Sequence, residues 1–127
     1  MRTFSRWWSV GVGAMDASTG MLLVACPAWV LSILQIEGVG EGSLIFLRWI
    51  GVFVGGVGIG YAQVFRGWRQ AETVWRMTAW IRGWVAAFVT MNIVTGSLSP
   101  AWAAVAITDA VVAFIQAWGL TKGWWRE

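Results

Sequence analysis

The chain has 127 residues, of which 58% are hydrophobic and 12% charged, whereas an ordinary soluble domain carries about 25% charged residues. A soluble core of this size cannot enclose so much apolar surface, so the composition predicts an integral membrane protein. The net charge of +3 resides in short stretches between apolar segments, so it indicates membrane topology and argues against nucleic acid as a partner.

Apolar segments occupy residues 7–26, 44–65, 74–94 and 101–120, and each approaches the ~20 residues that cross a bilayer. A membrane span must satisfy its own backbone hydrogen bonds, so each segment is predicted to be an α-helix. The fold class is therefore an all-α polytopic membrane protein, with four transmembrane helices in one domain of residues 1–127.

The sequence PAWVLSILQI, residues 27–36, follows the first span and begins with proline, which suits the first turn of a helix. It is too short to cross the membrane, so we expect a short interfacial helix there. Residues 37–43 form a glycine-rich loop, and residues 95–100 form a tight turn before the last span.

The basic residues fix the predicted orientation. They lie at the N-terminus, around the link between the second and third spans, and at the C-terminus: Arg2, Arg6, Arg66, Arg69, Arg76, Lys122 and Arg126. The other two loops carry only Glu37 and Glu41. By the positive-inside rule, both termini are cytoplasmic, and we place the chain in the bacterial inner membrane.

The sequence is rich in tryptophan, and most of these side chains are predicted to be interfacial anchors rather than ligand contacts. Trp29, Trp49 and Trp102 fall toward the outer interface. A larger group falls toward the inner one: Trp7, Trp8, Trp68, Trp75, Trp80, Trp118, Trp124 and Trp125.

Small residues follow one face of the second span. Gly51, Gly55, Gly58 and Ala62 continue from Arg48 at helical spacing. Since lipid supplies no hydrophobic reason for helices to associate, small residues that allow close backbone approach predict a helix-packing surface.

Charged residues inside the spans are expected to pair. An unpaired charge at the middle of the bilayer costs ~2.5–3.5 kcal/mol on insertion scales. From their depths we expect Asp16 to pair with Arg82 and Asp109 with Arg48. The alternative is one shared cluster.

Two roles compete for these charges. One is structural, an interhelical ion pair that fixes which helices are neighbours. The other is functional, a proton relay or a polar pocket for a quinone headgroup. Asn92 and Gln116 are candidate ligand contacts in the second case.

Several short motifs resemble a known family. The stretch GMLLVACPAWVLSILQI contains an apolar run, then a proline, then a short amphipathic helix. Three further motifs follow in chain order: Arg48 with Gly51, GVGIGY and TDAVVAF. In this combination the chain resembles small bacterial membrane proteins of the DoxX-like type. The resemblance implies four helices, and some relatives accompany quinone-linked redox enzymes. Thiol chemistry is not carried over, because Cys26 is the only cysteine.

The sequence contains no histidine, and we identify no catalytic residue and expect no metal or haem ligation. The predicted function is a non-catalytic accessory subunit of a larger integral-membrane complex, in electron transport or photosynthesis, with membrane lipids and other membrane subunits as partners. The alternatives are a subunit that binds quinone, pigment or another hydrophobic molecule, and a small oligomeric transporter.

Overall fold

The computed structural model describes residues 1–126. These residues form α1 (Arg2–Ala25), α2 (Pro27–Ile33), α3 (Leu44–Gly60), α4 (Trp68–Val94) and α5 (Ala103–Thr121), with no strand among them. Short 3₁₀ helices flank α3 on both sides and precede α5: η1 (Glu41–Ser43), η2 (Tyr61–Arg66) and η3 (Pro100–Trp102). The prediction of an all-α fold is confirmed.

Three segments are long and apolar enough to cross a membrane: Glu41–Arg66, Trp68–Val94 and Pro100–Thr121. The pair α1 and α2 meets the same test only when taken together, and it bends by 119° at the break. By length and composition, the described residues thus contain three candidate spans, or up to four, rather than a clear four. The helix α1 carries Arg2 and Arg6 in its first two turns and Asp16 further along.

The break between α1 and α2 follows from Pro27. Proline supplies no backbone N–H and disfavours helical geometry in the residue before it. Cys26 accordingly has φ −145° and ψ 67°, outside the helical region, and α2 starts in a new direction at Pro27. The short helix predicted over residues 27–36 is present, although it ends at Ile33.

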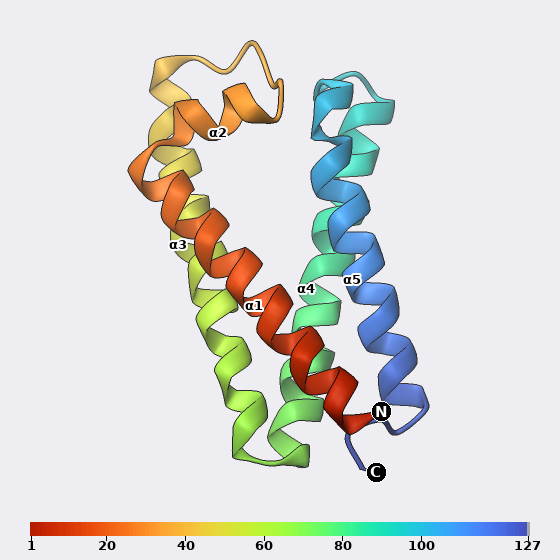
Figure 1. The fold of residues 1–127 in the computed structure, drawn as a ribbon. Coiled ribbons are helices and arrows are strands. Elements are labelled where there is room, and N and C mark those ends of the chain that lie inside the picture. Colours follow the sequence, from red (N-terminus) through yellow and green to blue (C-terminus); the bar gives the residue numbers. More distant parts are fainter. Residues whose placement is uncertain (127) are drawn as a thin grey trace.

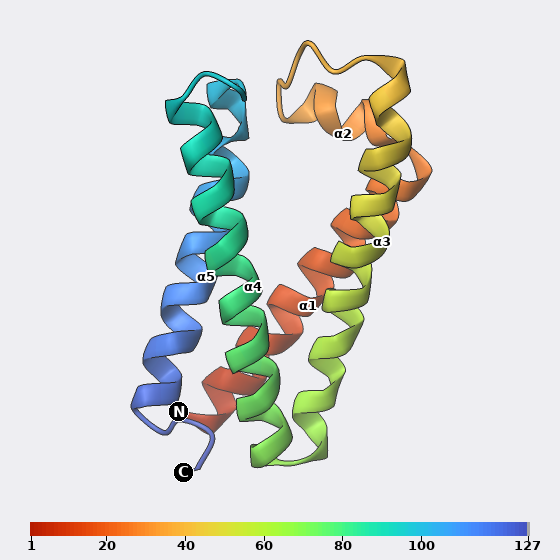
Figure 2. The same ribbon diagram turned by 180° about the vertical axis from the view of Figure 1, so that it is seen from behind.

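The helices form two pairs, α1 with α3 and α4 with α5 (Figure 1). Both termini and the link between α3 and α4 lie at one end of the bundle, which we call the terminal end (Figure 2). At the opposite end lie α2 and the turn at residues 95–100. All the basic stretches of the sequence therefore share the terminal end.

Glycines bring α1 and α3 into backbone contact. A Cβ added at Gly20 would lie 2.6 Å from the carbonyl oxygen of Gly51, and one added at Gly58 would lie 2.7 Å from that of Gly13. Gly55 lies opposite Gly20. Ala62 does not share this surface: it lies in η2 and is exposed, because the change to 3₁₀ geometry after Gly60 alters the helical register.

The largest core cluster lies toward the terminal end and joins Val12, Tyr61, Val64, Ala71, Trp75, Val112 and Trp125. Trp75 is 0% and Trp125 1% exposed, so these two side chains are core residues rather than the predicted interfacial anchors. Their rings meet edge to face, with centroids 5.3 Å apart. Trp7, Trp29, Trp49 and Trp80 are exposed.

Candidate functional site

The centre of the bundle holds an ion cluster of Asp16, Arg82 and Asp109. Arg82, on α4, donates from Nη2 to Oδ2 of Asp16 on α1 and from Nη1 to Oδ1 of Asp109 on α5, the latter at 2.6 Å. The exposed fractions of the Arg82 and Asp16 side chains are 7% and 8%. The bond to Asp16 therefore joins the two helix pairs, whereas the bond to Asp109 joins α4 to α5 within one pair.

The helical register of each segment places these groups inside. Arg82 shares the buried face of α4 with Trp75, Thr78, Ala86 and Val89. Asp16 lies on the face of α1 that also buries Ser9, Gly13 and Gly20. In α5, Asp109 stands three residues before the buried Val112 and seven before the buried Gln116.

The charges of the ion cluster are not balanced. Two carboxylates and one guanidinium carry a formal charge of −1 when both acids are ionised, and a single proton on either acid would neutralise the cluster. A planar guanidinium can serve two carboxylates at once because its donors form a rigid fork. The geometry can thus hold three helices together or retain one exchangeable proton.

A second layer of hydrogen bonds adjoins the ion cluster. The Tyr61 hydroxyl donates to Oε1 of Gln116 at 2.6 Å, and Arg82 Nε lies 3.4 Å from the same hydroxyl. Gln116 Nε2 donates to Thr78 Oγ1 at 2.7 Å and to the carbonyl of Trp75 at 3.1 Å. Gln116 is fully buried, and both the oxygen and the nitrogen of its side-chain amide form hydrogen bonds within the protein. Its amide is therefore engaged in contacts between helices.

The hydrogen bonds continue from this layer toward the terminal end. Trp75 Nε1 donates to Ser9 Oγ at 2.8 Å, and the Ser9 hydroxyl donates to the carbonyl of Ser5 at 2.8 Å. Tyr61 and Trp75 were not among the site residues predicted from the sequence. A signal was present for Trp75, which stands three residues before Thr78 and seven before Arg82 on one helical face.

Arg48 does not join the ion cluster, so the predicted pairing of Asp109 with Arg48 is wrong. Its guanidinium donates to the carbonyl oxygen of Val24 in the last turn of α1. The last carbonyls of a helix have no partner within it, and α1 stops short because of Pro27. A basic side chain at a helix C-terminus also interacts favourably with the helix dipole.

Asn92 also lies apart from the ion cluster. Its side-chain amide donates to the carbonyl of Phe88 within α4, at 2.8 Å. Because this bond is internal to one helix, Asn92 contributes no link between helices.

At the terminal end, Arg126 and Glu72 form a two-point ion pair, with Nε 2.7 Å from Oε1 and Nη2 3.1 Å from Oε2. The hydrogen bond and charge of Glu72 raise the pKa of Arg126 above its ordinary value. The Arg126 guanidinium also lies over the Trp68 ring, 5.5 Å from its centroid. This pair ties the segment after α5 to the start of α4.

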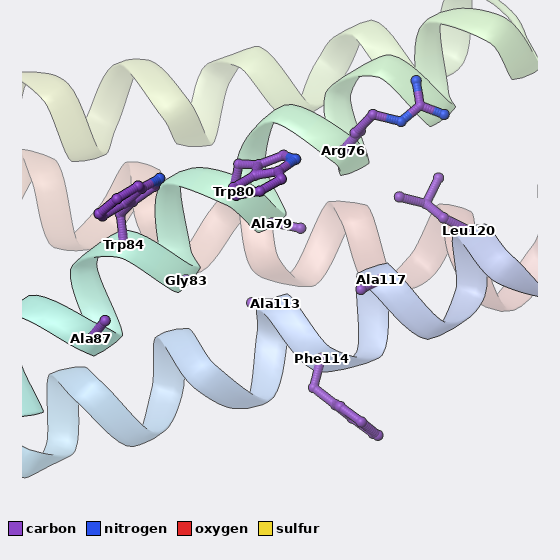
Figure 3. Close-up of a pocket in the computed structure, with 10 residues that line it drawn as sticks. All are labelled: Arg76, Ala79, Trp80, Gly83, Trp84, Ala87, Ala113, Phe114, Ala117 and Leu120. Atoms are coloured by element: carbon purple, nitrogen blue, oxygen red, sulfur yellow. The ribbon is translucent and has the colours of Figure 1, made fainter.

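A groove of about 600 Å³ runs along the outer side of the contact between α4 and α5 (Figure 3). Its lining is almost entirely apolar, with Arg76 as the exception: Arg76, Ala79, Trp80, Gly83, Trp84, Ala87, Ala113, Phe114, Ala117 and Leu120. The ion cluster lies on the opposite, inward face of α4, so the groove is a separate feature.

The fold and the site define an all-helical bundle with several candidate membrane spans and a buried ion cluster between its helix pairs. Within residues 1–126, no group of three or more His, Cys, Asp or Glu side chains is arranged to hold a metal ion. Comparisons with protein-family models, with curated proteins and with solved structures found no match to this chain. The DoxX-like resemblance therefore stays a prediction.

Proposed function

We propose that the chain is a multi-pass protein of the bacterial inner membrane that crosses the bilayer four times, with both termini in the cytoplasm. The shared location of the basic stretches at the terminal end supports this orientation. As the fourth crossing, α1 has 24 residues and a length of about 36 Å, enough for a hydrocarbon core of about 30 Å. The short α2 then lies along the outer interface.

Within that membrane, the chain acts as a non-catalytic accessory subunit of a larger integral-membrane complex of electron transport or photosynthesis. The observation that carries this proposal is the double engagement of Arg82 with Asp16 and Asp109. Through these two bonds, Arg82 holds α1 of one helix pair against α4 and α5 of the other. Large apolar side chains such as Phe53, Trp84 and Phe88 are exposed instead, available to lipid and to neighbouring subunits.

The experiment is purification from native membranes of the tagged chain at its natural expression level, in a mild detergent. We expect other integral-membrane proteins to co-elute in a fixed ratio and to be missing from an untagged control. Elution of the chain alone, both before and after cross-linking in intact membranes, would contradict the proposal.

The same preparation distinguishes the alternatives. A quinone or pigment in its solvent extract, at a molar amount comparable to the protein, would instead favour a subunit that binds hydrophobic molecules. Solute flux into liposomes that contain the purified chain, above that of empty liposomes, would favour an oligomeric transporter.

A further inference from the structure

The floor of the groove between α4 and α5 consists of small residues. Ala79, Gly83 and Ala87 recur at every fourth position of α4, and Ala113 and Ala117 face them from α5 (Figure 3). A Cβ placed at Gly83 would meet nothing within 4 Å. The floor is therefore open space beside the helices, whereas the space beside Gly20 and Gly58 is occupied by the backbone of the other helix in the α1–α3 pair.

Exposed aromatic rings border the floor. Trp80 and Trp84 project from successive turns of α4, and Phe114 projects from α5 (Figure 3). Trp84 is 71% exposed and lies near the middle of α4, far from either end of that helix. An anchor at headgroup depth is expected near a helix end, so anchoring does not explain its position.

Two cationic side chains lie at the end of this surface that is nearer the termini. Arg76 lines that end of the groove, and Lys122 lines an adjoining hollow of about 370 Å³ that shares Phe114 and Ala117 with it. Among the residues that the structure describes, no carboxylate lines either hollow. Within residues 1–126, Arg76 and Lys122 have no ion-pair partner, unlike Arg126, which is held by Glu72.

We propose that this surface binds one anionic phospholipid, with its phosphate between Arg76 and Lys122 and its acyl chains in the two hollows on either side of Phe114. The inference rests on the proposed membrane placement, which puts this end at the cytoplasmic headgroups. Basic pockets between transmembrane helices on that side of a membrane suit anionic headgroups. Arginine is well suited to phosphate because its donors match two oxygens at once.

The length of the groove favours a lipid over a transmembrane helix. From residue 76 to residue 87 the groove follows α4 for about 17 Å, at about 1.5 Å per residue. Half of a hydrocarbon core measures about 15 Å, so an acyl chain from one leaflet fits this length. A partner helix that packed along the whole of α4 would extend beyond the groove, because α4 runs from Trp68 to Val94.

The test is the lipid retained by the full chain after reconstitution in vesicles of equal phosphatidylglycerol and phosphatidylcholine, read by native mass spectrometry. We expect the wild type to retain phosphatidylglycerol preferentially. Arg76→Gln combined with Lys122→Gln should reduce that preference roughly tenfold. The matched control, Arg6→Gln with Arg66→Gln, removes two exposed charges outside both hollows and should leave it unchanged.

A second pair of variants tests the groove itself. Gly83→Leu should fill the floor and displace the lipid, whereas Gly56→Leu should not, although both glycines have nothing within 4 Å of an added Cβ. Unchanged phosphatidylglycerol retention in Arg76→Gln/Lys122→Gln and in Gly83→Leu would overturn the proposal. If water-soluble glycerol phosphate displaced phosphatidylglycerol as well as the lipid itself does, the proposal would also be overturned, and the surface would be assigned to a free phosphate.

Two other results would contradict the proposed lipid site and identify a different occupant of this surface. A dimer mass that Gly83→Leu abolishes would assign the surface to a second copy, and a cross-link from Trp84 to another subunit would assign it to that subunit. If the wild type does not insert into vesicles at all, the proposed membrane placement fails, and this outcome is distinct from insertion without lipid preference.

Discussion

Two of the interfaces in this bundle, the contact of α1 with α3 and the contact between the helix pairs, differ in the residues that build them. Between α1 and α3 the contact is backbone against backbone, made by Gly20, Gly51 and Gly58. Between the helix pairs, charged and hydrogen-bonding side chains, above all Arg82 and Asp16, meet beside the apolar core cluster.

The two interfaces therefore have different roles: one sets how closely two helices approach, and the other sets which helices are neighbours. Glycines let two helices approach closely, but many helices with small residues can do the same. A guanidinium that needs two carboxylates is satisfied only when α1 and α5 both lie beside α4. The glycine contact thus sets the distance within one pair, and the ion cluster selects which helices become neighbours. Variants that damage one interface at a time would break or sharpen this distinction.

The largest effect is expected for Arg82→Met, because it leaves the buried Asp16 and the partly buried Asp109 without a partner. Loss of one partner from a buried ionic group costs about 3–5 kcal/mol, so we expect a large drop in the unfolding midpoint in detergent. Adding Asp16→Asn and Asp109→Asn should restore much of it, since no charge then remains buried. A triple variant no more stable than Arg82→Met would show that the charges do not join the helix pairs.

The next effect is expected for Gly20→Leu, which places a side chain against the backbone of Gly51 and Gly55. Overpacking of this kind costs about 1–3 kcal/mol and should separate α1 from α3, a change measurable by disulfide trapping between cysteines introduced across the contact. The control is Gly11→Leu in the same helix, where an added Cβ meets nothing within 4 Å. Equal loss of trapping in both variants would contradict a specific glycine contact.

Most of the successful sequence predictions came from the helical spacing of residues and from their expected depth in the membrane. The small-residue face at Gly51, Gly55 and Gly58 is visible because spacing alone defines a helical face. Depth brings Asp16 and Arg82 to similar levels. The same reasoning could not assign Asp109, because depth does not show that one arginine can serve two acids.

Other features depend on where helices stop and how they rotate. The acceptor of Arg48 is a carbonyl left unpaired where α1 ends, which becomes identifiable only once the break before Pro27 is located. The register of Ala62 changes because α3 continues as the 3₁₀ helix η2. Trp75 resembles an interfacial anchor by depth, and only the rotation of α4 places it against Ser9.

The smallest effect is expected for Arg48→Gln, although Arg48 is one of the charged residues within the spans. Its partner is a single carbonyl of Val24 and its side chain is exposed, so the ion cluster should persist without it. A basic group at a helix C-terminus contributes about 0.3–1 kcal/mol, and glutamine retains a hydrogen-bond donor. We therefore expect a small fall in the unfolding midpoint and faster hydrogen exchange confined to the end of α1. A loss as large as that of Arg82→Met would mean that Arg48 helps to hold the helix pairs together, and the distinction between the two interfaces would then fail.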